Sequence, residues 1–386
     1  MIDHNIVLSI IKTALGETPA DLGADFLIDE YIQFAYMQQI EALLITGLLK
    51  SRVALSADVR KLLYGASMVS SRQLNALKHL YDVFDEHEID YMPLKGCVLK
   101  YLYPSDELRS MGDIDILVRM EQYEDIRFLM LNEGYRGGNE SDHHYRWSSS
   151  DVHIELHKRL IPSYNKDYFA YYGDGWQLAK LSETPYRYEM SHEDTFIYLF
   201  THYAKHYRDA GVGIRQALDL YVYGKTYPDT DKTYVMGKMQ KLQLERFYEN
   251  TMHMLDAWFE GKEHTEASQL IENRLFDSGV FGTSENSLQS TMLKQTNAIG
   301  TVKKAKLIKW VNLLFPPYSG MSKLYPFLKK TPFLLPLMWP VRWVDVILHR
   351  HNRIQARLQE DKDVSKESID AYRDMLHKSG LDFNFK

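Results

Sequence analysis

The sequence has few of the features expected of a secreted, membrane-spanning or strongly basic protein. Cys97 is the only cysteine among 386 residues, so an intramolecular disulfide cannot form. No run of about 20 apolar residues is free of charge, which argues against a membrane-spanning helix. The first residues lack the basic segment and cleavage site of a secretory signal. The formal net charge of -6 gives no overall positive field for nucleic acid. We therefore expect a cytoplasmic protein.

Two common motifs of phosphate and ester chemistry are also missing. The segments "GKTYPDTDKTY" and "GKEHTEAS" contain Gly-Lys pairs without the G-x-x-x-x-G-K-[ST] spacing of a P-loop. No G-x-S-x-G segment marks a nucleophilic serine. Cys97 has no evident base in the sequence, so we expect a small buried residue rather than a nucleophile. Any phosphate chemistry must therefore use a different arrangement.

The sequence pattern predicts a small α/β segment between helical regions. Apolar residues at helical spacing predict helices over 1–88, and short strand-like and helix-like segments alternate over 89–188. Helical spacing returns over 189–276, and the region 277–386 begins with a polar stretch over 277–300 that predicts a loop. We interpret the four regions as domains and the fold class as α+β.

One apolar segment, 326–348, leaves two interpretations open. It contains four prolines and several charged residues. It could pack on the body of the protein as a proline-broken segment. It could also lie on a membrane surface, because Trp339, Arg342 and Trp343 are residue types that favour interfaces. The second interpretation would make the protein peripheral to a membrane.

The strongest chemical signal is the pair Asp113 and Asp115 in "SMGDIDILV". Residues i and i+2 of a strand point to the same face, so the two carboxylates are expected side by side. Like charges this close raise each other's pKa unless a positive charge lies between them. Glu155 in "VHIELH" adds a third acid in the middle of a predicted strand. Three carboxylates suit Mg²⁺, a hard cation that prefers oxygen ligands.

A candidate phosphate-binding turn precedes the paired aspartates. Gly96 in "PLKGCVL" lies where a predicted strand ends and a helix begins, and glycine lets a backbone approach a ligand closely. N–H groups at the start of a helix attract anions, and Lys95 could add a positive charge. The turn and the three carboxylates together predict a site for a phosphorylated ligand and two Mg²⁺ ions.

This combination resembles the polymerase-β-like nucleotidyltransferase superfamily, in which a glycine-bearing turn precedes a D-x-D strand and a third acid on a later strand. The stretches "PLKGCVLKYLYPSDELRSMGDIDILV", "VHIELHKRL" and "HYAKHYRDAGVGIRQALDLYVY" look most like the bacterial uncharacterised nucleotidyltransferases. The resemblance covers about residues 30–350. Cys97 departs from the pattern, because glycine or serine usually follows the turn glycine.

The resemblance implies a small mixed-sheet core of the polymerase-β type, a nucleoside triphosphate (NTP) donor and Mg²⁺ as cofactor. Asp113, Asp115 and Glu155 match the catalytic, metal-ligating acids, and Gly96 matches the turn glycine. The implied reaction moves a nucleoside monophosphate to an acceptor and releases pyrophosphate. The net negative charge favours a small molecule, sugar or protein acceptor over nucleic acid, although a lysine cluster within 303–309 could hold tRNA.

Several residues near the motifs are candidates for nucleotide binding. The predicted set is Lys95, Gly96, Cys97, Arg109, His202, Lys205, His206 and Arg215. Arg109 lies four residues before the first aspartate and could neutralise a triphosphate. The two histidines and the lysine of "HYAKHY" share one helical face. These residues would also suit an ordinary surface, and Arg215 could simply pair with Asp219 within a helix.

Two further interpretations stay open. The chain could be a catalytically inactive nucleotide-binding or scaffold protein of the same fold, although three repelling carboxylates would then have no chemical purpose. His153, Glu155 and His157 could share one face of a strand and hold zinc, but the H-E-x-x-H spacing of helical zinc sites is absent. His143 and His144 are expected at a strand edge.

Overall fold

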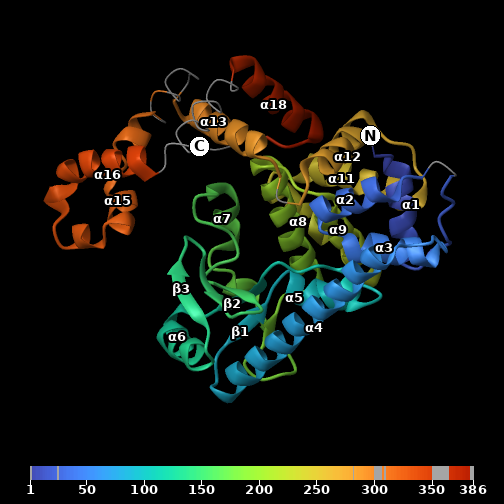
Figure 1. The fold of residues 1–386 in the computed structure, drawn as a ribbon, viewed down its shortest axis with the longest axis horizontal. Coiled ribbons are helices and arrows are strands. Elements are labelled where there is room, and N and C mark those ends of the chain that lie inside the picture. Colours follow the sequence, from blue (N-terminus) through green and yellow to red (C-terminus); the bar gives the residue numbers. More distant parts are fainter. Residues whose placement is uncertain are drawn as a thin grey trace. The chain divides into compact units, whose positions relative to one another are not determined.

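The computed structural model describes residues 2–23, 26–280, 282–299, 307, 310–349 and 365–382. The chain divides into two units, of which the first comprises Met1–Tyr207, Gly211–Gly282 and Ser379–Leu381 and the second Arg208–Ala210, Thr283–Lys378 and Asp382–Lys386 (Figure 1). The four lysines of the 303–309 cluster lie outside the described residues.

The N-terminal part of the first unit is helical, as the apolar spacing predicts. Its helices are α1 (His4–Ala14), α2 (Ile28–Gln38), α3 (Glu41–Lys50) and α4 (Ala57–Glu86). Side chains cap two of them: Asp3 accepts backbone N–H bonds at the start of α1, and Ser56 accepts one from Val59 at the start of α4. The 30-residue α4 supplies one wall of the α/β core.

The α/β core of the first unit is a five-stranded mixed sheet, which confirms the α+β prediction. The strands are β1 (Tyr91–Pro93), β2 (Ile114–Val118), β3 (Arg136–Glu140), β4 (His144–Ser148) and β5 (His153–His157), in the order β1-β2-β5-β4-β3. The short α5 (Gly96–Leu99) follows β1, and α6 (Tyr123–Asn132) follows β2. β2 and β5 run parallel, whereas the other neighbouring pairs are antiparallel. The alternating residues on the two sides of "SSSD" form the antiparallel β4–β5 hairpin, and β3 is an additional strand that the polar sequence "RGGNE" did not indicate.

The alternation of strand residues separates an apolar face from a polar one. Ile114, Ile116 and Val118 of β2 pack with Ile154 and Leu156 of β5 in the hydrophobic core. Apolar residues of α4 and α6 belong to the same core. The intervening residues of both strands therefore point to the opposite face. Figure 1 shows α4 and α6 beside the sheet, and the polar face is left for the functional groups.

The remaining helices of the first unit follow the sheet. They are α7 (Lys166–Tyr172), α8 (His192–Asp209), α9 (Ile214–Thr226), α10 (Lys232–Lys241), α11 (Glu245–Glu260) and α12 (Glu266–Ser278), and β6 (Lys180–Leu181) and β7 (Tyr188–Glu189) form a two-stranded ribbon before α8. Ser191 caps α8, because its hydroxyl accepts the Asp194 N–H at 3.1 Å. α8 and α9 contribute the cationic side of the site described below.

The second unit is built of helices. They are α13 (Ser284–Ile299), α15 (Tyr318–Leu324), α16 (Leu335–His349) and α18 (Lys366–Ser379). The prediction of a loop over 277–300 is therefore wrong for the residues of α13, where the polar composition still leaves Met292 and Leu293 buried. The segment 326–348 forms short helical turns and α16, with Pro340 inside the helix. Within the described residues, every helix is too short or too polar to cross a membrane.

Candidate active site

A cavity of about 550 Å³ lies over the polar face of the sheet, and we call it the main cavity. This volume is within the range typical of small-molecule sites, about 300–1,000 Å³. Its charged and imidazole lining consists of Lys95, Arg109, Asp113, Asp115, His143, His144, Arg146, Glu155, His202, Lys205, His206, Arg215 and Asp219. Gly96 lines it as well, so all the predicted site residues except Cys97 meet at one cavity. Five of the lining residues are lysine or arginine and four are aspartate or glutamate, so groups that can contact an anion and groups that can contact a cation meet at this cavity.

The acids on the floor of the cavity come from neighbouring strands. Asp115 of β2 and Glu155 of β5 are register partners in the parallel pair, so their side chains lie on the same face. Ligand atoms of Asp115, Glu155 and His157 lie within 4.8 Å of one another. Asp113 immediately precedes β2 and lines the same cavity, but it is not part of this close group. The structure thus brings two of the three predicted acids into direct proximity and the third to the same cavity.

Two cationic or hydrogen-bonding partners already hold Asp115. Lys95 Nζ lies 2.7 Å from Asp115 Oδ1, and His157 Nε2 lies 2.7 Å from the same oxygen. Burial by itself would raise the Asp115 pKa, but the Lys95 charge and the His157 hydrogen bond outweigh it and hold the pKa well below its usual range. Lys95 reaches this position from a backbone with φ of 45°, which is strained for a residue other than glycine. Part of the positive charge expected between the acids is therefore supplied by the protein.

Glu155 lies in a different electrostatic environment. Its Oε1 atom is 3.1 Å from Arg146 Nε and 3.2 Å from His144 Nε2. Burial and the nearby Asp115 charge nevertheless raise the Glu155 pKa. A raised pKa makes this carboxylate a better proton acceptor than an exposed glutamate. The pKa values of these neighbouring carboxyl groups are thus shifted in opposite directions, downward for Asp115 and upward for Glu155.

The low Asp115 pKa predicts a specific acid sensitivity. A carboxyl group whose folded pKa lies below the unfolded value of about 3.9 stabilises the fold fully above that pH. This contribution falls by up to about 1.4 kcal/mol per pH unit as the pH drops toward the folded pKa. We expect the difference in unfolding free energy between wild type and Asp115→Asn to narrow when urea unfolding is measured from about pH 7 to pH 3. A difference that stays constant over this range would contradict the low pKa.

The predicted phosphate-binding turn is tighter than its sequence suggests. A Cβ atom on Gly96 would lie 2.7 Å from Arg109 Nη1 and 2.7 Å from Met111 Cγ, so glycine is required by close packing. α5 is only four residues long, and the Cys97 N–H already donates to the Leu94 carbonyl at 3.0 Å. Cys97 is buried in the core behind the sheet, where burial and then the Asp115 charge raise the pKa of its thiol to about 12. The turn therefore positions Lys95 next to the acids, and Cys97 does not face the cavity.

Arg109 is held by a buried acid. Its Nη2 and Nε atoms donate to Asp219 of α9 at 2.9 and 3.2 Å, and Tyr103 donates to the same carboxylate at 3.0 Å. Both charged side chains are less than a tenth exposed. The intrahelical pair between Arg215 and Asp219 is not formed, because Arg109 occupies this carboxylate. Arg109 lines the cavity, but its guanidinium is engaged in joining the loop before β2 to α9.

Arg215 is the guanidinium with the clearest capacity for an anion. It donates to Gln39 Oε1 at 2.7 Å and to Ser110 Oγ at 2.9 Å, and it makes no ion pair within the part of the chain that is described. Burial and the neighbouring Arg109 lower its pKa to about 10, which leaves it charged at neutral pH. The predicted α8 residues His202, Lys205 and His206 line the same cavity, with the two imidazole rings 4.4 Å apart.

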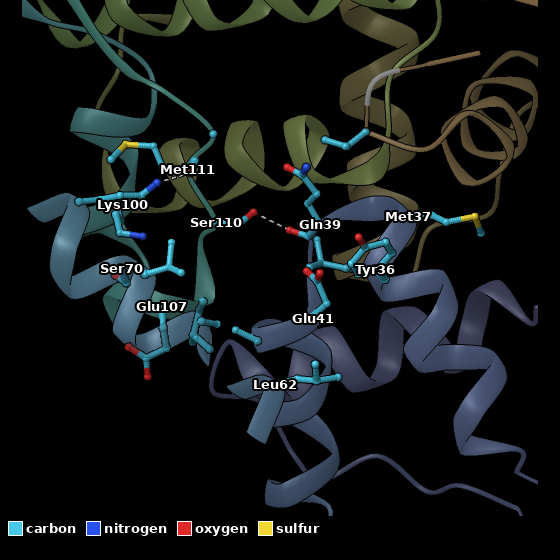
Figure 2. A pocket seen from close by; sticks show the side chains of 18 residues that line it. Tyr36, Met37, Gln39, Glu41, Leu62, Ser70, Lys100, Glu107, Ser110 and Met111 are labelled. Carbon is cyan, nitrogen blue, oxygen red and sulfur yellow. Dashed lines mark hydrogen bonds between the residues drawn. The ribbon is translucent and has the colours of Figure 1, made fainter. Parts of the chain in front are cut away.

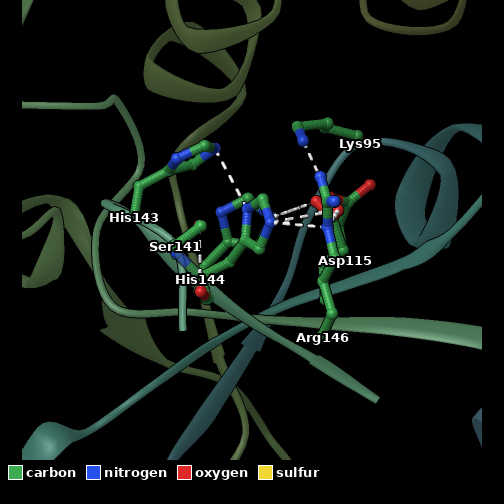
Figure 3. Close-up of polar contacts among 8 residues, drawn as sticks. Lys95, Asp115, Ser141, His143, His144 and Arg146 are labelled. Carbon is green, nitrogen blue, oxygen red and sulfur yellow. Dashed lines mark hydrogen bonds and ion pairs between the residues drawn. The ribbon is translucent and has the colours of Figure 1, made fainter. Parts of the chain in front are cut away.

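Three site residues were not predicted as such: His143, His144 and Arg146. His144 and Arg146 of β4 are the register partners of His157 and Glu155 on β5, which brings them to the polar face. Figure 3 shows His143 and His144 directed toward each other and Lys95 directed toward Asp115. The signal was present in the hairpin, because extending the pairs outward from its turn places His144 opposite His157.

A second cavity, which we call the side cavity, adjoins the main one. Its volume is about 540 Å³, and it shares Gln39, Met111 and Gly112 with the main cavity. Figure 2 shows residues of α2 and α3 on one wall and Lys100 with Ser110 and Met111 on the opposite wall. The remaining lining is mainly apolar, with the carboxylates Glu41 and Glu107 near it. The main cavity therefore has a neighbouring space that is less charged.

Fold and cavities together define an α+β protein whose main cavity is lined by carboxylates, histidines, lysines and arginines. Residues 24–260 match a family described as uncharacterised nucleotidyltransferase. The match covers more than half of the chain, and the protein belongs to this family. Among curated proteins, no significantly similar sequence was found. A similar solved structure is the solution structure of the antibiotic-resistance factor ANT(2'')-Ia, with 11% identity, a TM-score of 0.32 and coverage of 50% of this chain and 100% of that chain.

Proposed function

We propose that this protein is a metal-dependent nucleotidyltransferase that moves a nucleoside monophosphate from an NTP to a hydroxyl acceptor. The observation that carries the proposal is the convergence of Asp115 and Glu155 on neighbouring parallel strands beneath a cation-lined cavity. Family membership supports the reaction class.

The donor set on the floor of the cavity fits Mg²⁺. The carboxylates of Asp115 and Glu155 are hard oxygen ligands, and Asp113 lines the same cavity from the residue before β2. Burial and then the nearby Asp115 charge raise the Glu155 pKa, and a bound cation would offset the repulsion between these two carboxylates. When bound, Mg²⁺ would stabilise the negative charge of the reacting phosphate. Asp113, Asp115 and Glu155 are the residues that would hold it.

The protein side chains have distinct roles in this proposal. The acceptor oxygen forms a bond to the α-phosphorus while the bond from that phosphorus to the bridging oxygen breaks, and pyrophosphate leaves. In this proposal Glu155 also accepts the proton of the acceptor hydroxyl. Arg215 binds the negatively charged phosphates, and Lys95, which contacts Asp115 in this structure, would add a second positive charge beside the triphosphate. The side cavity, which adjoins the acids through Gly112, would accommodate the acceptor.

The proposal predicts metal-dependent nucleotide binding in which Arg215 takes part. Isothermal titration with ATP, GTP, CTP and UTP in Mg²⁺ is expected to show binding of at least one nucleotide, which EDTA abolishes. Arg215→Ala is expected to weaken that binding about 10- to 100-fold, as lost hydrogen bonds to a charged group cost about 1.5–3 kcal/mol. Arg127→Ala on α6 is the control, because its side chain is 55% exposed and pairs with Glu124 on the same helix.

The outcomes of this titration separate the proposal from its main alternative. No binding of any nucleotide, with or without Mg²⁺, would contradict it. Nucleotide binding that is indifferent to EDTA would favour an inactive nucleotide-binding protein, in which Lys95 and His157 permanently neutralise Asp115. Equal affinities of Arg215→Ala and wild type would remove Arg215 from the phosphate-binding set.

A further inference from the structure

Three histidines form a cluster at one side of the main cavity. They are His143, just before β4, His144 at the start of β4, and His157 at the end of β5. One nitrogen of each lies within 4.8 Å of one nitrogen of the others. His143 Nε2 and His144 Nδ1 are 3.1 Å apart. Two imidazoles bound to the same tetrahedral zinc ion have a nitrogen–nitrogen separation of about 3.3 Å, from Zn–N distances of about 2.0–2.1 Å.

The nitrogens of the cluster differ in their hydrogen-bond partners. His144 Nε2 accepts a hydrogen bond from Arg146 Nε at 3.1 Å and lies 3.2 Å from Glu155 Oε1, and His157 Nε2 lies 2.7 Å from Asp115 Oδ1. The Nδ1 atom of His157 is buried without a hydrogen-bond partner among the described residues. Histidine ligands of metals usually donate their other ring N–H to a carboxylate, which fixes the ring and the tautomer. Asp115 already holds the His157 ring in this way, and Glu155 lies within reach of His144.

We propose that His143, His144 and His157 bind a transition-metal ion of the zinc class, at a site that adjoins the carboxylates but uses imidazole ligands in place of them. Imidazole nitrogens suit Zn²⁺, Co²⁺ and similar ions, whereas Mg²⁺ prefers oxygen ligands. Three protein ligands leave a fourth position for a small ligand. The proposed site does not depend on the transfer reaction, because the three imidazoles have no assigned role in the transfer itself.

The site differs from the zinc arrangement considered from the sequence. His153 lies on the same strand face as Glu155 and His157, but it is exposed and belongs to neither close group of candidate ligands among the described residues. In the proposed site its place is taken by His143, just before β4, and His144, the first residue of β4. The exposed His153 therefore provides a matched control on β5.

The test is metal binding by the full chain after removal of metals with a chelator. Equilibrium dialysis against Zn²⁺ or Co²⁺, in excess Mg²⁺, is expected to leave one ion per chain, and Co²⁺ should give the visible absorption of a nitrogen-ligated site. His143→Ala is expected to weaken metal binding at least about tenfold. Mutating a group that merely supports a metal ligand costs about 10- to 100-fold in metal affinity, and loss of the ligand itself should cost at least as much. His153→Ala and Asp113→Asn are expected to bind as wild type does. Thermal unfolding verifies that each variant is folded, and His143 is only partly buried.

Three results would overturn the proposal. Wild type could retain no transition metal in the presence of Mg²⁺. His143→Ala could bind as tightly as His153→Ala. The metal could be lost from Asp113→Asn but retained by His143→Ala, which would place it on the carboxylates. In each of these cases the nucleotide titration remains an independent measurement, so the failure of this site and the failure of the nucleotidyltransferase proposal can be distinguished.

Discussion

Replacing Asp115 by asparagine is expected to lower nucleotidyl transfer by at least about 10³-fold. Loss of a metal-ligating carboxylate removes several kcal/mol of stabilisation of the reacting phosphate, and about 4 kcal/mol corresponds to three powers of ten. The asparagine side chain would keep the size of the aspartate and could still accept hydrogen bonds from Lys95 and His157. The measurement is release of pyrophosphate or transfer of α-labelled nucleotide, once titration has identified the donor.

The control for this experiment is another aspartate of the same sheet. Asp151 lies in the β4–β5 turn, is 52% exposed and pairs with Arg72 at 3.4 Å. Asp151→Asn should transfer nucleotide at the wild-type rate. Circular dichroism would verify that Asp115→Asn keeps its secondary structure. An Asp115→Asn protein that is folded and transfers nucleotide within tenfold of wild type would rule out this residue as a metal ligand.

Replacing Asp219 by alanine is expected to lower the unfolding free energy by about 3–5 kcal/mol, the usual cost of breaking a buried ion pair. The cost arises because Arg109 would keep its charge in a buried position without a counter-charge. Tyr103 would lose its hydrogen-bond acceptor as well. Urea unfolding followed by circular dichroism measures the change.

An exposed ion pair serves as the reference for the loss of unfolding free energy expected in Asp219→Ala. Asp58 and Lys61 lie 2.9 Å apart on α4 with side chains 89% and 75% exposed, and Asp58→Ala should change stability by less than about 1 kcal/mol. A double variant, Arg109→Leu with Asp219→Leu, should recover much of the loss, because apolar residues remove the unpaired charge. If Asp219→Ala is no more destabilising than Asp58→Ala, the buried pair does not contribute to the fold as inferred.

The sequence was informative where residues close in the chain determine the structure. The helices of 1–88, the strands around "YMP" and "DIDILV" and the β4–β5 hairpin follow from local periodicity and turn residues. The same local logic placed Asp113, Asp115 and Glu155 on strands or next to them, where the structure has them. It failed for α13, whose polar composition resembles a loop although tertiary packing buries part of its surface.

Local sequence patterns did not predict which side chains the site residues would contact. Lys95 was expected to face a phosphate, yet in the structure it neutralises Asp115, and the third partner of that group is His157. Arg109 was expected to be either exposed or at the triphosphate, yet Asp219 of α9 holds it. Such pairings join elements far apart in sequence, and one sequence contains no direct record of them. The hairpin register is the exception, since counting from its turn would have paired His144 with His157.

The insertion of β5 between β2 and β4 has a consequence for synthesis and folding. β2 leaves the ribosome long before β5, and their parallel pairing closes only after α6, β3 and β4 have been made. Such non-local pairing is slow, because the entropy of loop closure is lost before the contacts form. Until then one edge of the apolar strand "IDILV" has unpaired backbone groups, which favour association with other strands. The nascent chain is therefore most prone to aggregate in the interval between the synthesis of β2 and that of β5, and the addition of β5 covers this edge.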